Sequence, residues 1–582
     1  MKLASEDRIR LYTDAGWWGE TTLWQLFQRQ LAGRADQLAV ADACNREDFM
    51  PGAPQRLSWK ELADRVDRAC LMLLRSGFAR DDIVVVQLPN CVEQFALYLA
   101  CARLGIIVSP VPAQYREHEL AQILDLTAAR GAICCARIGR VSKPHDGDAM
   151  FRNLRASHPA LQAILAVGDT LLGETVSLDA WLARPCSDAD RQEIAVAEAA
   201  AGIGANDIFT ICWTSGTEAF PKGVPRSHNE WRTTGTSIIE SAELTPGMRL
   251  LNPFPLVNMA GISTAFISWL ELGASVIQHH PFSLDVFLRQ LREENVDYTV
   301  AAPAILNTLL QNEHMLEGIS FSRLKRIGSG SAPLSEWMVK SFAERHGVQI
   351  VNYYGSNEGA ALSGSHVDIP DPALRAQFFP RAGVPGYEWH VSTSRKIRTR
   401  LVDPDSGQEI SEPGRPGELR VSGPTIFSGY FNSPDMTARA FDTDGYYRTG
   451  DLFEIAGDRS QYYRFVGRSK DLIIRGGMNI SAEEVESLLL CYPGVMEAAV
   501  VGIPDDVLGE RLCACVVEEP GAALDLPAIN EFLHGQKRVA VYKLPEHLLR
   551  FEALPRNPVG KLLKRELRSA ARAMLTCEET QP

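Results

Sequence analysis

Apolar runs and amphipathic stretches alternate along most of this chain. Residues 82–111 read as an apolar strand, an asparagine-containing turn, an amphipathic helix and a second apolar strand. This βαβ pattern predicts parallel strands with helices on the faces of the sheet. The same alternation returns at 270–280 and 296–311. We therefore expect a mixed α/β fold whose large N-terminal domain contains parallel-type sheets.

The pattern changes twice towards the C-terminus. Glycine, proline and charged turns become dense after about Arg381, which predicts a small β-rich subdomain at about 385–469. Beyond Lys470 come a short helix, two strands and a basic helical tail, which predict a small α+β domain. We expect an N-terminal domain at 1–469 and a C-terminal domain at 470–582.

Length and charge narrow the possible classes of protein. The chain has 582 residues, of which 45% are hydrophobic and 23% are charged, and it exceeds what one hydrophobic core usually supports. Its formal net charge of -13 argues against a nucleic-acid partner, because nucleic-acid binders normally present a concentrated basic face. Because the chain as a whole is negatively charged, an anionic ligand must bind to hydrogen-bond donors and positive charges that are arranged locally.

The charges near the start of the chain, the interrupted apolar regions and the spacing of the cysteines favour a cytoplasmic protein. Charges stand near the start of the chain where a signal peptide needs an apolar stretch. The longest apolar region, 84–111, is interrupted by polar residues and a proline, so no membrane span is expected. Among the twelve cysteines, neither the pair Cys134 and Cys135 nor the pair Cys513 and Cys515 has a second pair at zinc-site spacing.

The segment TSGTEAFPKGV, residues 214–224, is the most informative motif. Hydroxyl side chains, small residues and Lys222 lie together after an apolar strand. Backbone N–H groups in such a loop can surround phosphate oxygens, and the lysine adds a positive charge. The loop differs from a Walker A motif, since Pro221 and Gly223 flank the lysine. Taken alone, an ordinary Gly/Ser/Thr turn explains it equally well.

This loop resembles the phosphate-binding signature of the acyl-adenylate-forming (ANL) superfamily, which includes acyl-CoA synthetases, stand-alone adenylation enzymes and beetle luciferases. The resemblance extends over nearly the whole chain and is nearest to the branch of dihydroxybenzoate-AMP ligases and cyclohexanecarboxylate-CoA ligases. Glu218 and Ala219 depart from the usual threonine and glycine. The resemblance implies that ATP phosphates bind Thr214, Ser215, Gly216, Thr217 and Lys222.

Two further motifs are similar to the walls of the acyl pocket in that superfamily. In FPLVNMAGI, residues 254–262, Asn258, Met259 and Gly261 would line the pocket, although Asn258 also suits a helix cap. GSGSAPL, residues 328–334, is similar to the loop that approaches the adenine and the acyl group. In this loop the resemblance assigns four residues to the binding of adenine and the acyl group: Ser329, Gly330, Ser331 and Ala332.

The motif NYYGSNEGA, residues 352–360, is similar to the family segment that binds adenine and magnesium. The resemblance implies that Tyr354 stacks on adenine, beside Gly355. It also implies that Glu358 binds Mg²⁺, a cation that requires oxygen ligands. Asn357 replaces the usual threonine, and its amide still offers a donor to phosphate. Without the resemblance, Glu358 would more often be a solvated loop charge.

The C-terminal motifs complete the implied site. Asp451 in GYYRTGD would accept hydrogen bonds from the ribose hydroxyls, and Arg468 would contact ribose or phosphate. Lys561 in NPVGKLLKREL would contact the acyl carboxylate and the α-phosphate as the catalytic lysine. Each of these residues alone would more often be a turn residue or a surface charge. The hinge of domain rotation would be Lys470, and the tunnel for the thiol arm would be formed by Gly476 and Gly477.

The resemblance implies an ATP-dependent ligase that activates a carboxylic acid as acyl-AMP, releases pyrophosphate and passes the acyl group to a thiol. The resemblance to the branch of dihydroxybenzoate-AMP ligases and cyclohexanecarboxylate-CoA ligases implies an aromatic or alicyclic acid. An amino acid is disfavoured, because NPFPLVNMAG offers no acidic partner for an amino group. The acceptor is CoA or, alternatively, the phosphopantetheine of a carrier protein. Luciferase-like oxidation and a regulatory protein with an inactive site are the remaining rivals. The motifs leave open whether the protein is a monomer or a homodimer.

Overall fold

The chain forms two compact units. The first comprises Met1–Arg398 and Val421–Tyr447, and the second comprises Thr399–Arg420 and Arg448–Pro582. The computed structural model describes residues 1–139, 144–168, 171–214, 221–359, 361–404, 406–468, 471–475, 478–505, 508–537, 539, 541–556 and 562–579. Lys470 lies outside these residues, and the expected domain boundary at that position stays a prediction.

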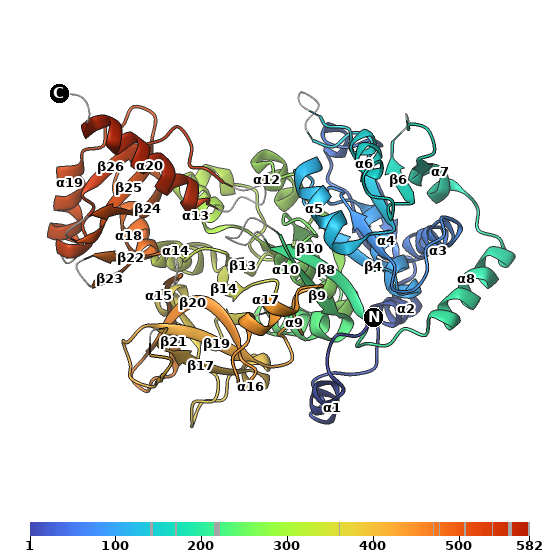
Figure 1. The fold of residues 1–582 in the computed structure, drawn as a ribbon, viewed down its shortest axis with the longest axis horizontal. Coiled ribbons are helices and arrows are strands. Elements are labelled where there is room, and N and C mark those ends of the chain that lie inside the picture. Colours follow the sequence, from blue (N-terminus) through green and yellow to red (C-terminus); the bar gives the residue numbers. More distant parts are fainter. Residues whose placement is uncertain are drawn as a thin grey trace. The chain divides into compact units, whose positions relative to one another are not determined.

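Two largely parallel sheets organise the first unit (Figure 1). Among the described residues, one sheet has eight strands in the spatial order β15 (Ala361–Gly364), β14 (Gln349–Gly355), β13 (Arg326–Gly330), β12 (Tyr298–Val300), β10 (Arg249–Asn252), β11 (Ser275–Gln278), β1 (Leu38–Ala41) and β2 (Arg56–Ser58). The other, over the same described part of the chain, has the order β7 (Val176–Ser177), β6 (Ala163–Val167), β5 (Gly131–Cys135), β3 (Ile83–Val86), β4 (Ile107–Pro110), β8 (Ile208–Thr214) and β9 (Lys222–Ser227).

The interior strands of both sheets pair in parallel, whereas the pairs β14/β15, β1/β2 and β8/β9 are antiparallel. The helices of this unit are α1 (Glu6–Asp14), α2 (Leu23–Arg34), α3 (Trp59–Arg75), α4 (Val92–Leu104), α5 (Glu117–Thr127), α6 (Gly147–Arg155), α7 (Leu178–Ala183), α8 (Asp188–Ala201), α9 (His228–Ser241), α10 (Met259–Gly261), the π-helix η2 (Ile262–Ile267), α11 (Ser268–Leu272), α12 (Leu284–Glu293), α13 (Pro303–Gln311), α14 (Glu336–His346), α15 (Pro372–Gln377), α16 (Thr393–Lys396) and α17 (Pro434–Ala440).

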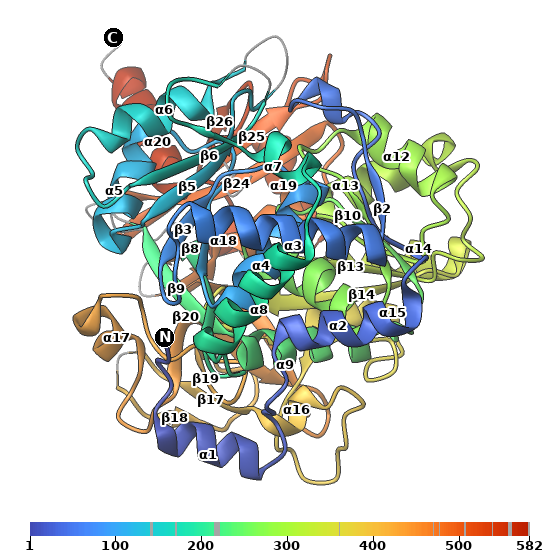
Figure 2. The same ribbon diagram turned by 90° about the vertical axis from the view of Figure 1, so that its right-hand side faces the viewer.

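The predicted βαβ unit at 82–111 is confirmed as β3, α4 and β4. The strands β3 and β4 pair in parallel, and every residue of β3 is buried. Helix α4 is buried along almost its whole length and ends at Gly105, whose φ of 72° is the left-handed conformation that glycine adopts readily. Figure 2 shows α2, α3, α4 and α8 side by side, in agreement with their contacts.

Aromatic side chains fill the centre of the first unit. The rings of Trp59 and Trp269 stack with their centroids 4.7 Å apart, and Phe95 meets Trp269 edge-on at 5.0 Å. All three side chains have no exposed surface. Rings that bury this much apolar area dominate the energy of a core, so they hold the helices against the sheets.

The second unit is built mainly from antiparallel strands. One group lies in the order β21 (Tyr462–Arg468), β20 (Tyr447–Ala456), β19 (Gly417–Ser422), β17 (Arg398–Val402) and β18 (Glu409–Ile410). Another group has the order β23 (Met478–Ser481), β22 (Leu472–Arg475), β25 (Gly509–Glu518) and β24 (Val495–Asp505), and β26 (His547–Arg550) pairs with β25. Its helices are α18 (Ala482–Leu489), α19 (Leu526–Glu531) and α20 (Lys564–Glu579).

The expected fold class is therefore confirmed, including the short helix and the two strands predicted after Lys470. Within the described residues, no helix is both long and apolar enough to cross a membrane.

Three buried histidines predict how stability depends on pH. Burial lowers the pKa of His228, His279 and His280 from 6.5 to about 4. Between these values the unfolded chain binds protons that the folded chain does not, so stability is complete above pH 6.5 and falls as pH drops towards 4. Across this window each histidine lowers the free energy of unfolding by about 3 kcal/mol as the pH falls.

We expect His228→Gln to reduce by about one the number of protons taken up on unfolding near pH 5. The measurement is the dependence of the denaturant midpoint and free energy of unfolding on pH, with the exposed His118→Gln as the control. An unchanged pH slope for His228→Gln would contradict the assignment.

Candidate active site

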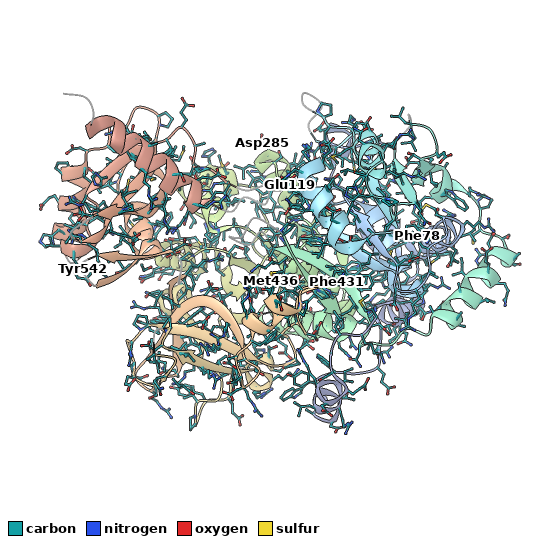
Figure 3. All side chains as sticks on the ribbon, viewed as in Figure 1. Phe78, Glu119, Asp285, Phe431, Met436 and Tyr542 are labelled. Carbon is teal, nitrogen blue, oxygen red and sulfur yellow. The ribbon has the colours of Figure 1, made fainter. Side chains whose placement is uncertain are left out.

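The two ends of the predicted phosphate loop lie side by side. Strand β8 ends at Thr214 and β9 begins at Lys222, and these residues are partners in the antiparallel pair. The N–H of Phe431, labelled in Figure 3, donates to the carbonyl of Gly223 at 2.9 Å and so fixes the second end. The loop residues outside the described part of the chain are Ser215, Gly216, Thr217 and Phe220, together with the departures Glu218 and Ala219.

A cation, a ring and a carboxylate meet beside this loop. The Nζ of Lys222 lies 5.5 Å from the centroid of the Tyr430 ring. The Tyr430 hydroxyl donates to Oε1 of Glu358 at 3.0 Å. Glu358 is only 6% exposed, so its position is set by the protein rather than by solvent. Glu358 is therefore not a solvated loop charge.

Asn357 connects three segments that are distant in sequence. Its Nδ2 donates to the carbonyl of Trp213 at 3.1 Å, at the end of β8. Its Oδ1 accepts from the N–H of Met259 at 2.7 Å, at the start of α10. Asn357 thus ties the phosphate-loop strand to the predicted acyl wall, and one hydrogen of its amide is already used in doing so.

The predicted acyl wall begins with a helix cap. Asn258 is the N-cap of α10, and its side chain accepts from the N–H of Gly261 at 3.2 Å. A Cβ at Gly261 would overlap the carbonyl oxygen of Pro255, so this glycine permits a close backbone approach. The amide of Asn258 therefore serves the backbone, as the alternative reading of this residue anticipated.

The strands β13 and β14 bring together the two motifs that are predicted to approach adenine. They pair in parallel, with Gly330 opposite Tyr353. The Ser329 hydroxyl donates to the carbonyl of Ala301 at 2.8 Å and is buried. Further along are Ser331, whose φ is 69°, and the residues Ala332, Tyr354 and Gly355. Because parallel strands end at the same edge of a sheet, these residues share one edge, where ligands of open α/β sheets bind.

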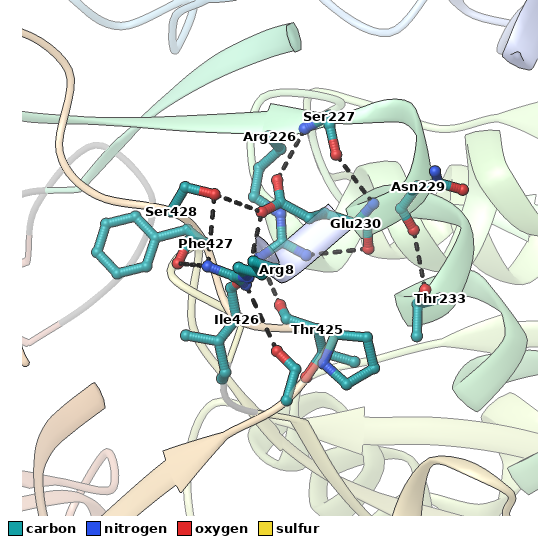
Figure 4. Close-up of polar contacts among 12 residues, drawn as sticks. Arg8, Arg226, Ser227, Asn229, Glu230, Thr233, Thr425, Ile426, Phe427 and Ser428 are labelled. Carbon is teal, nitrogen blue, oxygen red and sulfur yellow. Dashed lines mark hydrogen bonds and ion pairs between the residues drawn. The ribbon is translucent and has the colours of Figure 1, made fainter. Parts of the chain in front are cut away.

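A buried guanidinium organises the backbone around Glu358. Arg226 has no exposed surface and donates to the carbonyls of Thr425 at 2.8 Å and Glu230 at 3.1 Å (Figure 4). It also donates to the carbonyl of Asn357 at 3.3 Å. Burial lowers its pKa, but a guanidinium stays charged in proteins. Arg226 lies four positions after Lys222 on β9, so the same strand carries the ammonium and the organising cation.

In the second unit, Asp451 and Arg468 are partners across the antiparallel pair β20/β21. Oδ1 of Asp451 lies 3.4 Å from Nε of Arg468, so the carboxylate expected at ribose has a cation beside it. The predicted residues of this region that lie outside the described part of the chain are Lys470, Gly476, Gly477 and Lys561.

Sequence reasoning missed two residues of this arrangement. Tyr430 stands in the motif GPTIFSGYFN, and Arg226 stands in VPRSHNEW, yet neither was assigned a role. The sequence offered one signal for each residue: Tyr430 has an aromatic hydroxyl and Arg226 has a guanidinium, and both stand close to recognised motifs. Their partners lie far away in sequence, so the motifs alone did not reveal the contacts.

Comparison with known sequences identifies the family. The profile of the AMP-binding enzyme family matches residues 27–431, which is more than half of the chain. The profile of the AMP-binding enzyme C-terminal domain matches residues 484–561. The chain belongs to the AMP-binding enzyme family.

Relatives within this family span the chain from end to end. A medium-chain fatty-acid–CoA ligase of Escherichia coli (strain K12) is 31% identical over 99% of this chain and 96% of its own length. A salicylyl-CoA synthase / salicylate adenylyltransferase of a Streptomyces species is 30% identical over 96% of each chain. The crystal structure of ATP-bound MatB from Rhodopseudomonas palustris has a TM-score of 0.73 and 27% identity, and covers 94% of this chain and 99% of that one.

This AMP-binding enzyme is an ATP-dependent acid–thiol ligase that forms an acyl-AMP. Its carboxylate Glu358 fits a magnesium ion, which proteins usually bind through one or two carboxylates and the phosphates of the substrate. Tyr430 donates to Oε1, and no described residue forms a hydrogen bond with Oε2. The described residues hold no cluster of three or more His, Cys, Asp or Glu that could bind a metal alone, so the cation would also need substrate oxygens.

The bridge formed by Asn357 can be tested by a substitution that keeps its shape. In Asn357→Asp the acceptor for Met259 remains, but a carboxylate oxygen faces the carbonyl of Trp213. Because a buried acceptor then loses its donor, we expect the free energy of unfolding to fall by about 2 kcal/mol or more.

Asn432→Asp is the matched control, since Asn432 also donates to a carbonyl, that of Leu126, at 3.1 Å, but is exposed to water. Denaturant unfolding followed by fluorescence measures both variants. Equal losses would contradict the bridging role of Asn357.

Proposed function

We propose that this ligase activates an aromatic or alicyclic monocarboxylic acid as its acyl-AMP and then transfers the acyl group to the thiol of CoA. The observation that carries the proposal is the cluster of Lys222, Tyr430 and Glu358 at the ends of the phosphate loop. An ammonium group and a buried carboxylate beside this loop support the binding of a nucleoside triphosphate and its cation.

The segment 252–261 supports the class of acid. It contains no charged residue, so nothing in it would pair with the amino group of an amino acid. The Streptomyces relative is named for salicylate, an aromatic acid, and the Escherichia coli relative is named for medium-chain fatty acids. Alicyclic, aromatic and fatty acids are therefore the classes to compare.

The residues that are predicted to bind ATP contact different parts of the nucleotide in this proposal. Tyr354 stacks on the adenine, and Asp451 with Arg468 holds the ribose. Glu358 holds Mg²⁺, which when bound draws negative charge from the phosphates. The phosphate oxygens are bound by Lys222 and the loop residues Thr214, Ser215, Gly216 and Thr217.

The first half-reaction is a displacement at phosphorus. A carboxylate oxygen of the acid forms a bond to the α-phosphorus, and the bond from that phosphorus to pyrophosphate breaks. Lys222 compensates the charge of the departing pyrophosphate. Lys561 offsets the charge that gathers between the carboxylate and the α-phosphate, a preorganised effect that contributes several kcal/mol.

In the second half-reaction the thiol sulfur bonds to the acyl carbonyl carbon, its proton passes to solvent, and AMP leaves. Lys561 has no evident task in this step. We propose that the C-terminal domain, 470–582, rotates about Lys470 between the two half-reactions. The rotation would bring Gly476 and Gly477 to the narrow pantetheine arm.

A carrier protein is the alternative acceptor. Its phosphopantetheine presents the same thiol arm as CoA, so the residues that bind the arm do not distinguish the two. The name of the Streptomyces relative includes both a CoA synthase and an adenylyltransferase, so adenylation without transfer to free CoA is also compared. Thioester formation with free CoA and with a phosphopantetheinylated carrier decides between them.

Acid-dependent exchange of labelled pyrophosphate into ATP tests the proposed function. We expect exchange with at least one aromatic or alicyclic acid, and a kcat/KM that exceeds that for fatty acids of similar size. Hydroxylamine trapping of the acyl-AMP provides an independent readout. Absence of exchange with every acid in the panel would favour an inactive, regulatory nucleotide-binding protein.

Lys561→Ala separates the two half-reactions. Because one charge aimed at the reacting oxygens is lost, we expect adenylation to fall by about 10²–10³-fold. Thioester formation from supplied acyl-AMP should stay close to the wild-type rate. Lys340→Ala, at an exposed site, is the control. Equal losses in both half-reactions would contradict the rotation.

A further inference from the structure

We propose that Arg8 is a positioning residue that holds segment 423–430 in register, so that Tyr430 and the backbone of Phe427 fix Glu358. This inference rests on the proposed function. Arg8 lies on α1 and precedes residue 27, where the match to the family profile begins. A residue that precedes the match to the family profile would then support the carboxylate proposed to bind magnesium.

The guanidinium of Arg8 binds successive backbone carbonyls of this segment (Figure 4). Nη1 donates to the carbonyl of Phe427 at 3.1 Å and to the hydroxyl of Ser428 at 3.4 Å. Nη2 donates to the carbonyl of Ile426 and, at 3.5 Å, to that of Gly423. A planar fork with several donors suits this task, whereas a lysine ammonium could not reach all of these oxygens at once.

Neighbouring side chains hold Arg8 itself in place. Its guanidinium carbon lies 5.5 Å from the ring centroid of Tyr12 and 5.6 Å from that of Trp18. Nη2 lies 3.9 Å from Oε1 of the buried Glu230. The indole N–H of Trp18 adds a further donor to the segment, since it bonds the carbonyl of Pro424 at 3.2 Å. Arg8 is therefore confined by aromatic faces and a carboxylate.

Phe427 connects Arg8 directly to Glu358. The carbonyl of Phe427 accepts from Arg8, and its N–H donates to the carbonyl of Glu358 at 2.9 Å. Three residues further on, Tyr430 donates to the carboxylate of Glu358 and places its ring near Lys222. The same short segment thus holds both the main chain and the side chain of Glu358.

Loss of Arg8 would remove the donor of the Ile426 and Phe427 carbonyls in a largely buried setting, whereas the Gly423 carbonyl would keep the N–H of Ile426 at 3.2 Å. Such groups move to find water or other donors, because an unsatisfied buried acceptor costs about 1–3 kcal/mol. A shift of segment 423–430 would move Tyr430 and Glu358 together. Since catalysis depends on placement to within a fraction of an ångström, the cation-binding step should weaken.

A double-mutant cycle with the full-length protein tests this positioning role. The variants are Arg8→Ala, Tyr430→Phe and the double variant, with Arg10→Ala as the matched control on the same helix. Arg10 is 71% exposed and pairs with Asp7 at 3.8 Å. The readouts are the kcat for pyrophosphate exchange, the Mg²⁺ concentration for half-maximal rate and the Mg²⁺ concentration for half-maximal ATP binding by calorimetry without acid, measured well below each variant's unfolding temperature.

We expect Arg8→Ala to lower kcat by about tenfold to 100-fold and to raise the half-maximal Mg²⁺ concentration by about threefold or more. Arg10→Ala should stay within about twofold of the wild type. Because both residues act on Glu358, the double variant should be no more than about twofold worse than the poorer single variant.

Multiplicative losses in the double variant, or wild-type Mg²⁺ dependence in Arg8→Ala, would overturn the proposal. Should Arg8→Ala fail to fold, Arg8→Lys carries the test with an expected shift in Mg²⁺ dependence of about twofold or more, and no shift would overturn it. If the wild type is active and Arg8→Ala has the same kcat and Mg²⁺ dependence, only the role of Arg8 is rejected. If the wild type is inactive with every acid, the proposed function is rejected, and the role of Arg8 is rejected with it.

Discussion

The candidate active site depends on a charge that is fully removed from water. A buried guanidinium is tolerated only when most of its N–H groups find acceptors, and Nη1 and Nη2 of Arg226 find them in the carbonyls of Thr425, Asn357 and Glu230. These carbonyls belong to three segments that are far apart in sequence. Satisfying one side chain therefore brings together the strand after the phosphate loop, the turn that carries Glu358 and the segment that leads to Tyr430.

Networks of this kind favour specific geometry over stability. Glu230 illustrates the point, because it completes the capping box of α9 with Ser227, accepts from Ser428 at 3.3 Å and lies close to Arg8. Ion pairs removed from water contribute little net stability, yet a network of many partners restricts the arrangements that its members can adopt. In this protein the arrangement places the Tyr430 ring near the Lys222 ammonium and the Tyr430 hydroxyl on the Glu358 carboxylate.

The departure at Asn357 has a physical explanation in the same setting. A threonine hydroxyl is shorter than a carboxamide, whereas the amide of Asn357 spans the distance between the Trp213 carbonyl and the Met259 N–H. The residue links the strand before the predicted phosphate loop to the predicted acyl wall through one planar group.

Local signals in the sequence determined the elements and the identity of several site residues. The βαβ unit at 82–111 and helix α18 follow from apolar periodicity, and Lys222 and Glu358 stand within short motifs. Only the tertiary structure decided that Tyr430 donates to Glu358 and that Arg8 and Arg226 hold the backbone around it. Periodicity reports contacts within a few residues, whereas the partners of a buried polar group are selected by the packing of distant segments.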